Sequence, residues 1–450
     1  MKGKLMIWIL FLSNIAFFLK NYYRADKDFF HPSVLFTFTF TLFTFCCCIA
    51  NLYMGIDIGN ISTYVIITIG NLLISLCGWS FRRTPLNAQI SSKEVESIKV
   101  SPILLLFAIA MILITIYSMY HYIIDFASQF GVGGSFTDCV VQFKIIMTFA
   151  DADSILLQPP TYLHPFMTFS AVFGYVFLYL YVREKVLLNH TNILYLSILI
   201  LYLMFSLMGG ARSDGFRYIT AYIFLWYYFL ILKNGIEYNK ILLMKMFFIG
   251  FFLIFLMVGY LFVTGRNDGN LKLDYIIEQI FIYAGAPIFN LDHFLSEMHS
   301  PLKGIWGEST FGRLINWIGV KFDISNFRYA PDSPFMTYQN YEMGNVYTTY
   351  YSFYYDFNFI GVIVLTFVLA VCCCAIYKNV IELNIIEPKV HFLIIVYAYL
   401  TNDIIMLPFS NRFYETIANP ASWYLVFFGY AFIKYIDYNN DNEMKKMDED

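Results

Sequence analysis

Charged side chains are scarce in this sequence. Only 14% of its 450 residues are Asp, Glu, Lys or Arg, whereas 59% are hydrophobic and 20% are aromatic. A soluble globular domain carries roughly a quarter charged residues and is about half apolar. The scarcity of charge therefore excludes an ordinary soluble domain and indicates an integral membrane protein. The net charge of -3 also argues against a nucleic-acid-binding surface.

Common catalytic and metal-binding motifs are missing as well. No H-E-x-x-H, P-loop, G-x-G-x-x-G or G-x-S-x-G pattern with suitable flanks occurs, which argues against a metalloprotease, a nucleotide-driven pump and an α/β-hydrolase. No set of carboxylates and histidines demands a metal, so we expect neither a metal nor a cofactor. The cysteine runs 46–48 and 372–374 lie inside apolar segments, and we interpret them as small buried side chains because consecutive helical residues point in different directions.

Long apolar runs are abundant. A hydrocarbon core about 30 Å thick needs about 20 apolar residues per helix, and the runs here are continuous, unlike the alternating strands of a transmembrane barrel. They predict an all-α polytopic fold with about eleven transmembrane helices (roughly 10 to 13) in a single integral membrane domain, 1–450. The expected spans are near 5–19, 33–54, 61–80, 102–120, 163–183, 191–209, 216–233, 242–264, 350–377, 389–407 and 421–437.

Basic residues indicate the orientation of these spans. Lys and Arg gather in connections that fall on alternate sides of the count, and such loops are usually cytoplasmic. The C-terminal tail falls on the same side, so we expect a cytoplasmic C-terminus in a multi-pass protein of a bacterial inner membrane. The orientation of the N-terminus stays open, because basic residues flank the first span on both sides. The loop residues are Arg82, Arg83, Lys93, Arg183, Lys185, Lys233, Lys240, Lys245, Lys378 and Lys389.

The opposite, extracytoplasmic face receives the longer connections. The segment 121–162 contains a candidate surface helix, "SFTDCVVQFKIIMTF" (135–149). The segment 265–349 is far longer than a usual loop and contains an amphipathic stretch, 274–298, that is too polar to span. We therefore expect both segments to have structure of their own.

Two nearly identical tetrapeptides, "RSDG" from Arg212 and "RNDG" from Arg266, each follow an apolar run and emerge on this outer face. Either one alone can be a turn with an arginine that reaches the headgroups. The pair, beside glycines, favours a shared anion site, because a guanidinium binds phosphate oxygens in a bidentate manner. Arg217 lies inside the following span, where a charge needs a cavity or a partner.

Three further groups on the outer face are candidates for binding or catalysis. The stretch 344–363 places Asn345, Tyr347 and Asp356 among aromatic residues, as in a sugar-binding cleft, although an interfacial aromatic belt explains the rings equally well. Arg412 lies near Glu415 in a short loop, where a salt pair is the alternative to an anion site. His293, which is next to Asp292 in the large outer loop, is a possible general base, and His164 begins a span on the same face, although a lone histidine is more often structural.

Together, the many spans, "GGARSDG", "TGRNDG", the long late outer loop and "NVYTTYYSFYYDFNFIG" resemble the Wzy-type oligosaccharide repeat-unit polymerases of bacterial surface polysaccharides. That family tends to show Asn-Val-Tyr-Thr, then Tyr-Asp-Phe-Gly and a further Gly. In this sequence Asn358 replaces the first of those glycines, whereas Gly361 is retained. The resemblance in architecture covers nearly the whole chain, and the motifs cover about a tenth of it.

The resemblance implies an inner-membrane glycosyltransferase of the GT-C type, active in O-antigen (lipopolysaccharide) or capsule-type synthesis. It would transfer a growing glycan from undecaprenyl diphosphate to a new lipid-linked repeat unit on the periplasmic face, without a metal. Arginines would stabilise the departing diphosphate, and a carboxylate or histidine would serve as base. The diphosphate candidates are Arg212 and Arg266, then Arg217 and Arg412; the base candidates are Asp292, His293 and Glu342.

Two other functions remain open. An O-antigen ligase would share the architecture and the arginines but use another acceptor. A flippase for lipid-linked oligosaccharides would use arginines to guide a diphosphate through a cavity, although such transporters usually have internal repeats and short loops. The expected partners are the bilayer and undecaprenyl-diphosphate-linked oligosaccharides; whether a chain-length regulator binds the outer loops is left open.

Overall fold

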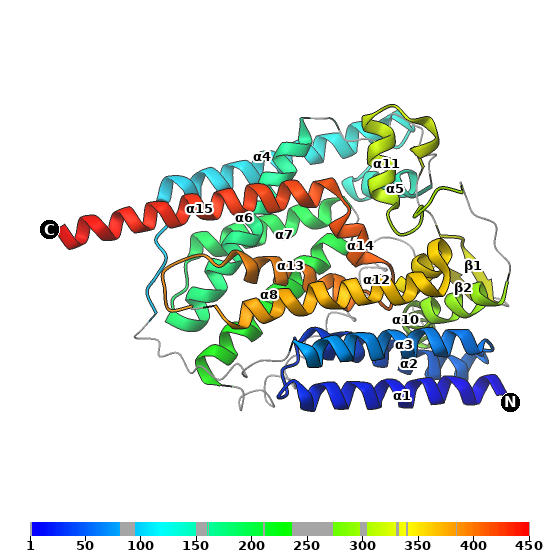
Figure 1. Ribbon diagram of the computed structural model, residues 1–450. Coiled ribbons are helices and arrows are strands. Elements are labelled where there is room, and N and C mark those ends of the chain that lie inside the picture. Colours follow the sequence, from blue (N-terminus) through cyan, green and yellow to red (C-terminus); the bar gives the residue numbers. More distant parts are fainter. Residues whose placement is uncertain are drawn as a thin grey trace. The chain divides into compact units, whose positions relative to one another are not determined.

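The computed structural model describes residues 2–81, 95–149, 160, 162–209, 212–235, 273–297, 304–329, 333–338, 341–383 and 385–449. Nearly all regular structure in this part of the chain is helical (Figure 1). Among the described residues, seven helices are long and apolar enough to cross a membrane, and two shorter ones, α7 (Ile193–Met208) and α13 (Phe392–Ile405), are also apolar. The protein is therefore an all-α polytopic membrane protein, which confirms the coarse prediction.

The predicted spans can be compared with the helices one by one. The span expected near 242–264 lies outside the described residues, and each of the others coincides with a helix. The total number of transmembrane helices stays a prediction. The seven are α1 (Lys2–Arg24), α2 (Pro32–Met54), α3 (Ile61–Ser80), α4 (Pro102–Gln129), α6 (Leu163–Arg183) with its π-helical extension η2 (Glu184–Leu188), α8 (Arg212–Asn234) and α12 (Thr349–Ile381). Helix α15 (Pro420–Glu449) is also long, but it is not among these seven.

Local sequence signals set several helix boundaries. Proline occupies the first turn of α2 and of α4, where its missing N–H costs nothing. The Asn60 side chain caps α3 by accepting from the Ser62 amide, and Asn192 caps α7 in the same way. Gly55 ends α2 with φ of 69°, a left-handed conformation that glycine adopts without strain.

The chain divides into two compact units, whereas the sequence analysis treats it as one membrane domain. Unit 1 comprises Met1–Pro85, Leu243–Asn379 and Asp403–Asn419. Unit 2 comprises Leu86–Leu242, Val380–Asn402 and Pro420–Asp450. Each unit is described by itself below.

In unit 1, helices α1, α2 and α3 pack against one another along a seam of polar side chains. Asn71 donates to Asn14 at 2.7 Å, and Asn14 donates to Thr44 at 3.3 Å. Asn21 donates to Ser75 at 2.9 Å, farther along the same helices. Because hydrocarbon offers no hydrogen bonds, such pairs hold neighbouring helices in register.

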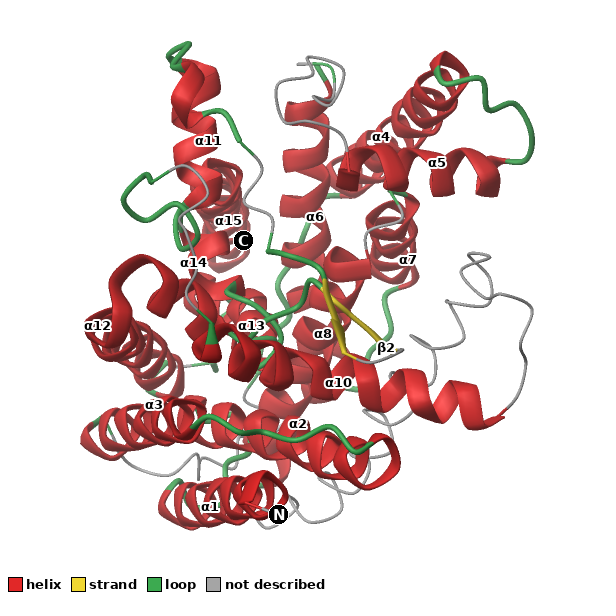
Figure 2. Ribbon diagram, turned by 90° about the vertical axis from the view of Figure 1, so that its right-hand side faces the viewer, coloured by secondary structure: helices red, strands yellow, loops and turns green. Residues whose placement is uncertain are grey.

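Helix α10 (Leu273–Ser296) packs on α2 and α3, and the antiparallel hairpin of β1 (Met336–Tyr338) and β2 (Tyr341–Gly344) lies beside it (Figure 2). Cys47 of α2 donates to the carbonyl of Gly285 at 3.3 Å, so the two helices approach closely there. The amphipathic stretch expected at 274–298 is thus helical, and it packs on the helices of unit 1. Two short helices, α11 (Gly312–Lys321) and α14 (Arg412–Ile417), also belong to this unit.

Helix α12 contains a sharp break at Asn358, where φ is 52° and ψ is -151°. This region of backbone space is essentially restricted to glycine, and it is the position at which the resembled pattern carries glycine. One turn later, a Cβ on Gly361 would lie 2.4 Å from the Phe353 carbonyl oxygen. The break therefore depends on the absence of a side chain at 361 and is strained by the presence of one at 358.

In unit 2, α4, α6 and α7 pack against one another, while α8 and α15 pack on α6. The segment 135–149 contains α5 (Phe136–Phe149), which packs on the end of α4. Cys139 of α5 is buried there among Met119, Ile123, Phe126 and Phe143. All eight cysteines are free thiols, and seven of them are buried.

The break in α12 generates a prediction about stability. Asn358→Gly should raise the free energy of unfolding by about 1 kcal/mol, because glycine adopts this conformation without strain. Gly361→Ala should lower it by about 2 kcal/mol, because the new methyl group collides with backbone. Thermal unfolding of the purified protein in detergent measures both; opposite signs support the break, and destabilisation by both variants contradicts it.

Candidate functional site

The predicted site residues fall into both units. Arg266 lies outside the described residues, as does the side chain of Arg212, whose backbone begins α8 in unit 2. Arg217 also belongs to unit 2. The remaining candidates belong to unit 1 and lie near the ends of α10, β2, α12 and α14: Asp292, His293, Glu342, Asn345, Tyr347, Asp356 and Arg412.

Asp292 fastens α10 to the beginning of α3. Its carboxylate accepts hydrogen bonds from the amides of Gly59 at 2.9 Å and Asn60 at 3.1 Å, and from the Thr63 hydroxyl at 2.6 Å. Burial raises the pKa of Asp292, and these hydrogen bonds oppose the rise. A carboxylate held by three donors at a helix N-terminus has little capacity left to accept a substrate proton, so the geometry favours an anchoring role.

The other two base candidates are more accessible. His293 follows Asp292 on α10, is about half exposed, and lies 3.0 Å from Glu297 through its Nε2 atom. An imidazole oriented by a carboxylate is a common arrangement for a general base. Glu342 is exposed on β2, opposite Thr337 of β1.

Four of the eight aromatic rings between residues 347 and 359 are packed inside unit 1. Tyr347, Tyr350, Tyr351 and Phe353 are all less than 5% exposed, so they are core residues rather than a lipid-facing belt or an open sugar platform. The Tyr347 hydroxyl donates to the carbonyl of Pro334 at 3.0 Å. Burial also raises the pKa of Tyr347.

The neighbouring Asn345 is half-buried, and Asn290 of α10 holds the chain beside it. The Asn290 side chain donates to the carbonyls of Val346 at 2.8 Å and Met343 at 3.3 Å. The junction between β2 and α12 is therefore fixed to α10, and Asn345 is presented from a rigid segment.

One half-buried and one buried carboxylate, those of Asp356 and Glu308, organise the turn 305–310. Asp356 accepts from the amides of Ser309 at 3.1 Å and Thr310 at 2.6 Å. Glu308, which is 2% exposed, accepts from the Ile305 amide at 3.1 Å and from the Tyr355 hydroxyl at 2.5 Å. These contacts give Asp356 a structural role in shaping the N-terminal part of α12.

The same turn presents an exposed aromatic ring. Trp306 is 79% exposed, and its ring packs edge-on against Phe357 with 4.9 Å between the centroids. A fixed and open indole face suits stacking against the C–H face of a sugar. Trp306 cannot be singled out from the sequence, because nothing in its local sequence distinguishes it from an interfacial tryptophan.

Arg412 belongs to a cluster of two arginines on one carboxylate. Arg412 lies 3.3 Å and Arg313 lies 3.6 Å from the same Oε2 atom of Glu415. Both guanidinium groups are partly exposed, and each makes only this one contact among the described residues. The cluster carries a net positive charge and has spare N–H donors, which is what a phosphate group requires.

The cluster is attached to the turn and to α12 through Asn411. The Asn411 amide donates to the Thr310 carbonyl at 3.1 Å, and the Thr349 hydroxyl donates to Asn411 at 3.4 Å. The Thr349 amide donates to the carbonyl of Leu407 at 2.9 Å. Arg313 was missed from the sequence because it lies in a long segment whose path cannot be read from hydropathy.

In unit 2, Arg217 interacts with a group of tyrosines inside the helices. Its Nη1 atom donates to the Tyr399 hydroxyl at 2.5 Å, and the guanidinium lies 4.5 Å from the centroid of the same ring. Tyr175 packs against Tyr399 and against Tyr218, at 5.1 and 5.4 Å. The charge that the sequence places inside this span thus has a polar aromatic partner on α13.

Comparisons with known proteins do not assign this chain to a family. Neither models of protein families, nor the curated proteins, nor the solved structures gave a match to the chain. Within the described part of the chain, no three His, Cys, Asp or Glu side chains gather as a metal site. The candidate site is thus a cationic cluster beside a fixed turn that carries an exposed tryptophan.

The anchoring role of Asp292 generates a prediction about pH. Because folding raises the pKa of Asp292 above its ordinary value of 3.8, its contribution to stability is full below that value and is lost as the pH rises through the folded pKa. Asp292→Asn does not titrate, so its melting temperature relative to wild type should increase with rising pH.

Thermal unfolding in detergent from roughly pH 4 to pH 7 measures this difference. Glu342→Gln, which removes a charge from an exposed side chain, is the matched control. If the difference in melting temperature between Asp292→Asn and wild type does not change with pH, folding does not raise the pKa of Asp292 and the prediction is wrong.

Proposed function

We propose that the protein is a polymerase that joins undecaprenyl-diphosphate-linked oligosaccharide repeat units, at the outer face of a bacterial inner membrane, in the synthesis of a surface polysaccharide. The proposal combines the resemblance of the sequence motifs with the site in unit 1. The observation that carries it is the pair of arginines, Arg313 and Arg412, held by one carboxylate and retaining spare donors.

A cluster of arginines suits the proposed reaction, because its leaving group is a diphosphate. The acceptor hydroxyl oxygen attacks the anomeric carbon of the donor glycan, and the bond from that carbon to the diphosphate oxygen breaks. The bonding electrons leave with the diphosphate, so negative charge grows on its oxygens in the transition state. Preorganised guanidinium groups stabilise that charge, and they do so most strongly where water is partly excluded.

Glu415 would position the arginines for this task. Two guanidinium groups repel each other. The shared carboxylate keeps both of them close together where α11 and α14 begin. One carboxylate offsets only one of the two positive charges, so the cluster still attracts an anion. Arg212 and Arg266 remain predicted diphosphate ligands on the strength of the sequence motifs, and Arg217 is a weaker one because Tyr399 engages it.

The acceptor hydroxyl also loses a proton. Among the candidates we favour His293, because it is accessible and Glu297 orients its ring, whereas Asp292 is engaged by three donors. Glu342 is the exposed alternative on β2. Trp306 and Asn345 are our candidates for contact with the glycan.

The proposal is tested by Arg→Lys variants in a strain that lacks the endogenous protein. Arg412→Lys, Arg212→Lys and Arg266→Lys keep the charge but lose the planar fork, so each should shorten the surface-glycan ladder, with activity lowered about tenfold or more. Ladder gels and membrane abundance are measured together. Arg328→Lys is the matched control, because Arg328 is engaged by the Gly319 carbonyl and by Asp323.

A full ladder from all three variants would overturn the diphosphate role of these arginines. A collapse to one repeat unit with normal protein abundance supports it. A ladder that keeps its full length on the lipid carrier but fails to reach the cell surface would indicate a ligase instead.

A further inference from the structure

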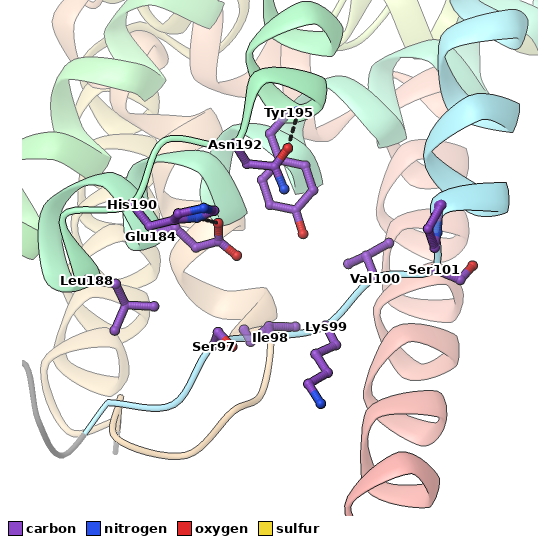
Figure 3. Close-up of a pocket in the computed structure, with 11 residues that line it drawn as sticks. Ser97, Ile98, Lys99, Val100, Ser101, Glu184, Leu188, His190, Asn192 and Tyr195 are labelled. Carbon is purple, nitrogen blue, oxygen red and sulfur yellow. Dashed lines mark hydrogen bonds and ion pairs between the residues drawn. The ribbon is translucent and has the colours of Figure 1, made fainter.

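Unit 2 contains a cavity of about 590 Å³ at the end where α6 finishes and α4 and α7 begin (Figure 3). Its wall consists of the segment 97–102, the π-helical turn η2 and the first residues of α7. The function proposed above does not use it. The lining residues include Ser97, Lys99, Ser101, Glu184, His190, Asn192 and Tyr195.

Two polar side chains with little exposure each turn one atom towards this cavity that no protein group engages. Tyr195 is 2% exposed, its hydroxyl makes no hydrogen bond among the described residues, and Figure 3 shows it directed into the open space. Glu184 is 5% exposed; His190 engages its Oε2 atom at 3.1 Å, and its Oε1 atom faces the cavity in Figure 3. Both atoms open onto the cavity, so a ligand bound there can donate a hydrogen bond to Glu184 and accept one from Tyr195.

The cavity wall carries charge of both signs. Helices α4 and α7 both begin at the wall, at Pro102 and Ile193, a helix N-terminus carries a partial positive charge, and Lys99 lines the same wall. Glu184 contributes a negative charge. The cavity therefore suits a zwitterion, whose positive end faces Glu184.

The position of the cavity narrows the choice of ligand. Two of the candidate membrane spans have an end at its wall, Pro102–Gln129 at its start and Leu163–Leu188 at its finish. The ends of membrane-spanning helices lie at the depth of lipid headgroups. The basic loops predict that this face of the protein is cytoplasmic.

We infer that the cavity binds the headgroup of a phospholipid that carries a primary ammonium beside its phosphate. The ammonium donates to Glu184 Oε1, and the Tyr195 hydroxyl donates to a phosphate oxygen. A quaternary ammonium lacks the N–H donors that Glu184 requires, and a glycerol headgroup lacks the positive charge.

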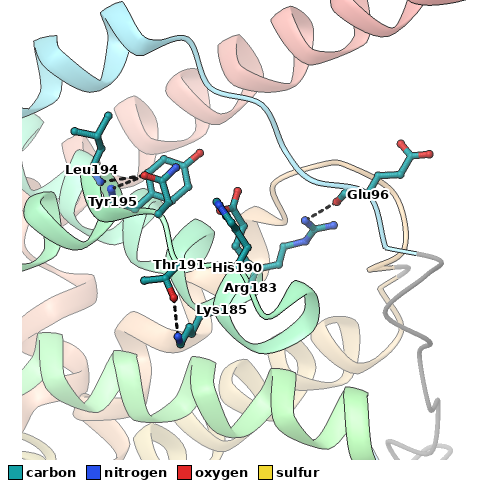
Figure 4. A network of polar contacts seen from close by, with 9 residues as sticks. Glu96, Arg183, Lys185, His190, Thr191, Leu194 and Tyr195 are labelled. Carbon is teal, nitrogen blue, oxygen red and sulfur yellow. Dashed lines mark hydrogen bonds and ion pairs between the residues drawn. The ribbon is translucent and has the colours of Figure 1, made fainter.

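The surrounding contacts hold this site in shape before a lipid binds (Figure 4). The fully buried Arg183 donates to the carbonyls of Glu96 at 2.9 Å and Ile385 at 3.3 Å, which fixes the segment leading to 97–102. Lys185 donates to Thr191 at 2.6 Å and closes the loop after η2. A preformed site binds more tightly because little ordering remains to be paid for.

The inference is tested by native mass spectrometry of the full-length protein titrated with lipids of identical acyl chains. Phosphatidylethanolamine should bind about tenfold more tightly than phosphatidylcholine or phosphatidylglycerol, because it alone satisfies both ends of the cavity. Glu184→Gln should abolish the preference over phosphatidylcholine. Asp125→Asn, which removes an exposed carboxylate near the other end of α4 and outside the cavity, should leave it unchanged.

Tyr195→Phe supplies a second test. This substitution should lower the affinity for phosphatidylethanolamine and for phosphatidylcholine equally, about two- to tenfold, because both lipids carry the phosphate that the hydroxyl contacts. Phosphatidylethanolamine carrying one, two or three N-methyl groups tests the wild-type protein directly. The affinity of the protein for these lipids should fall with each N–H donor that is lost. Equal affinity for all headgroups in the wild type, or a preference that survives Glu184→Gln, would overturn the inference.

Discussion

A polar or charged side chain among apolar helices needs a partner, and this constraint determines most of the described structure. Asp292 receives three donors at the start of α3, and the buried Arg183 is surrounded by backbone carbonyls. Arg217 reaches Tyr399, and the asparagines of α1 and α3 engage each other. Each of these side chains therefore fixes where two segments meet.

A few side chains keep hydrogen-bond donors or a ring face that no other protein group uses. Arg313 and Arg412 share one carboxylate and keep most of their donors, and Trp306 keeps an open face on a turn that Glu308 and Asp356 hold rigid. A framework of satisfied polar groups thus supports a few unsatisfied ones, which is the arrangement a binding or catalytic site needs. The proposal of a glycan polymerase follows from what those few groups can do to a diphosphate.

Hydropathy alone predicted the helices, because each apolar run is long enough to read without knowledge of its neighbours. The amphipathic pattern at 274–298 predicted the helix observed at 273–296, and the candidate surface helix at 135–149 is observed at 136–149. The engagements of side chains were not predictable: Asp292 contacts residues more than two hundred positions away, and Arg313 meets Glu415 across a hundred. The break at Asn358 was visible only as a missing glycine in a resembled pattern, and its cause is a backbone angle that no propensity reveals.

The most direct test of the polymerase is the state of the lipid-linked glycan in a strain from which the protein is deleted. Lipids are extracted and analysed by mass spectrometry, and intact spheroplasts are treated with membrane-impermeant periodate to determine which face carries the glycan. The account predicts single repeat units on undecaprenyl diphosphate that periodate modifies. Single units that are protected from periodate would indicate a flippase, and polymers of normal length on the carrier would contradict a polymerase outright.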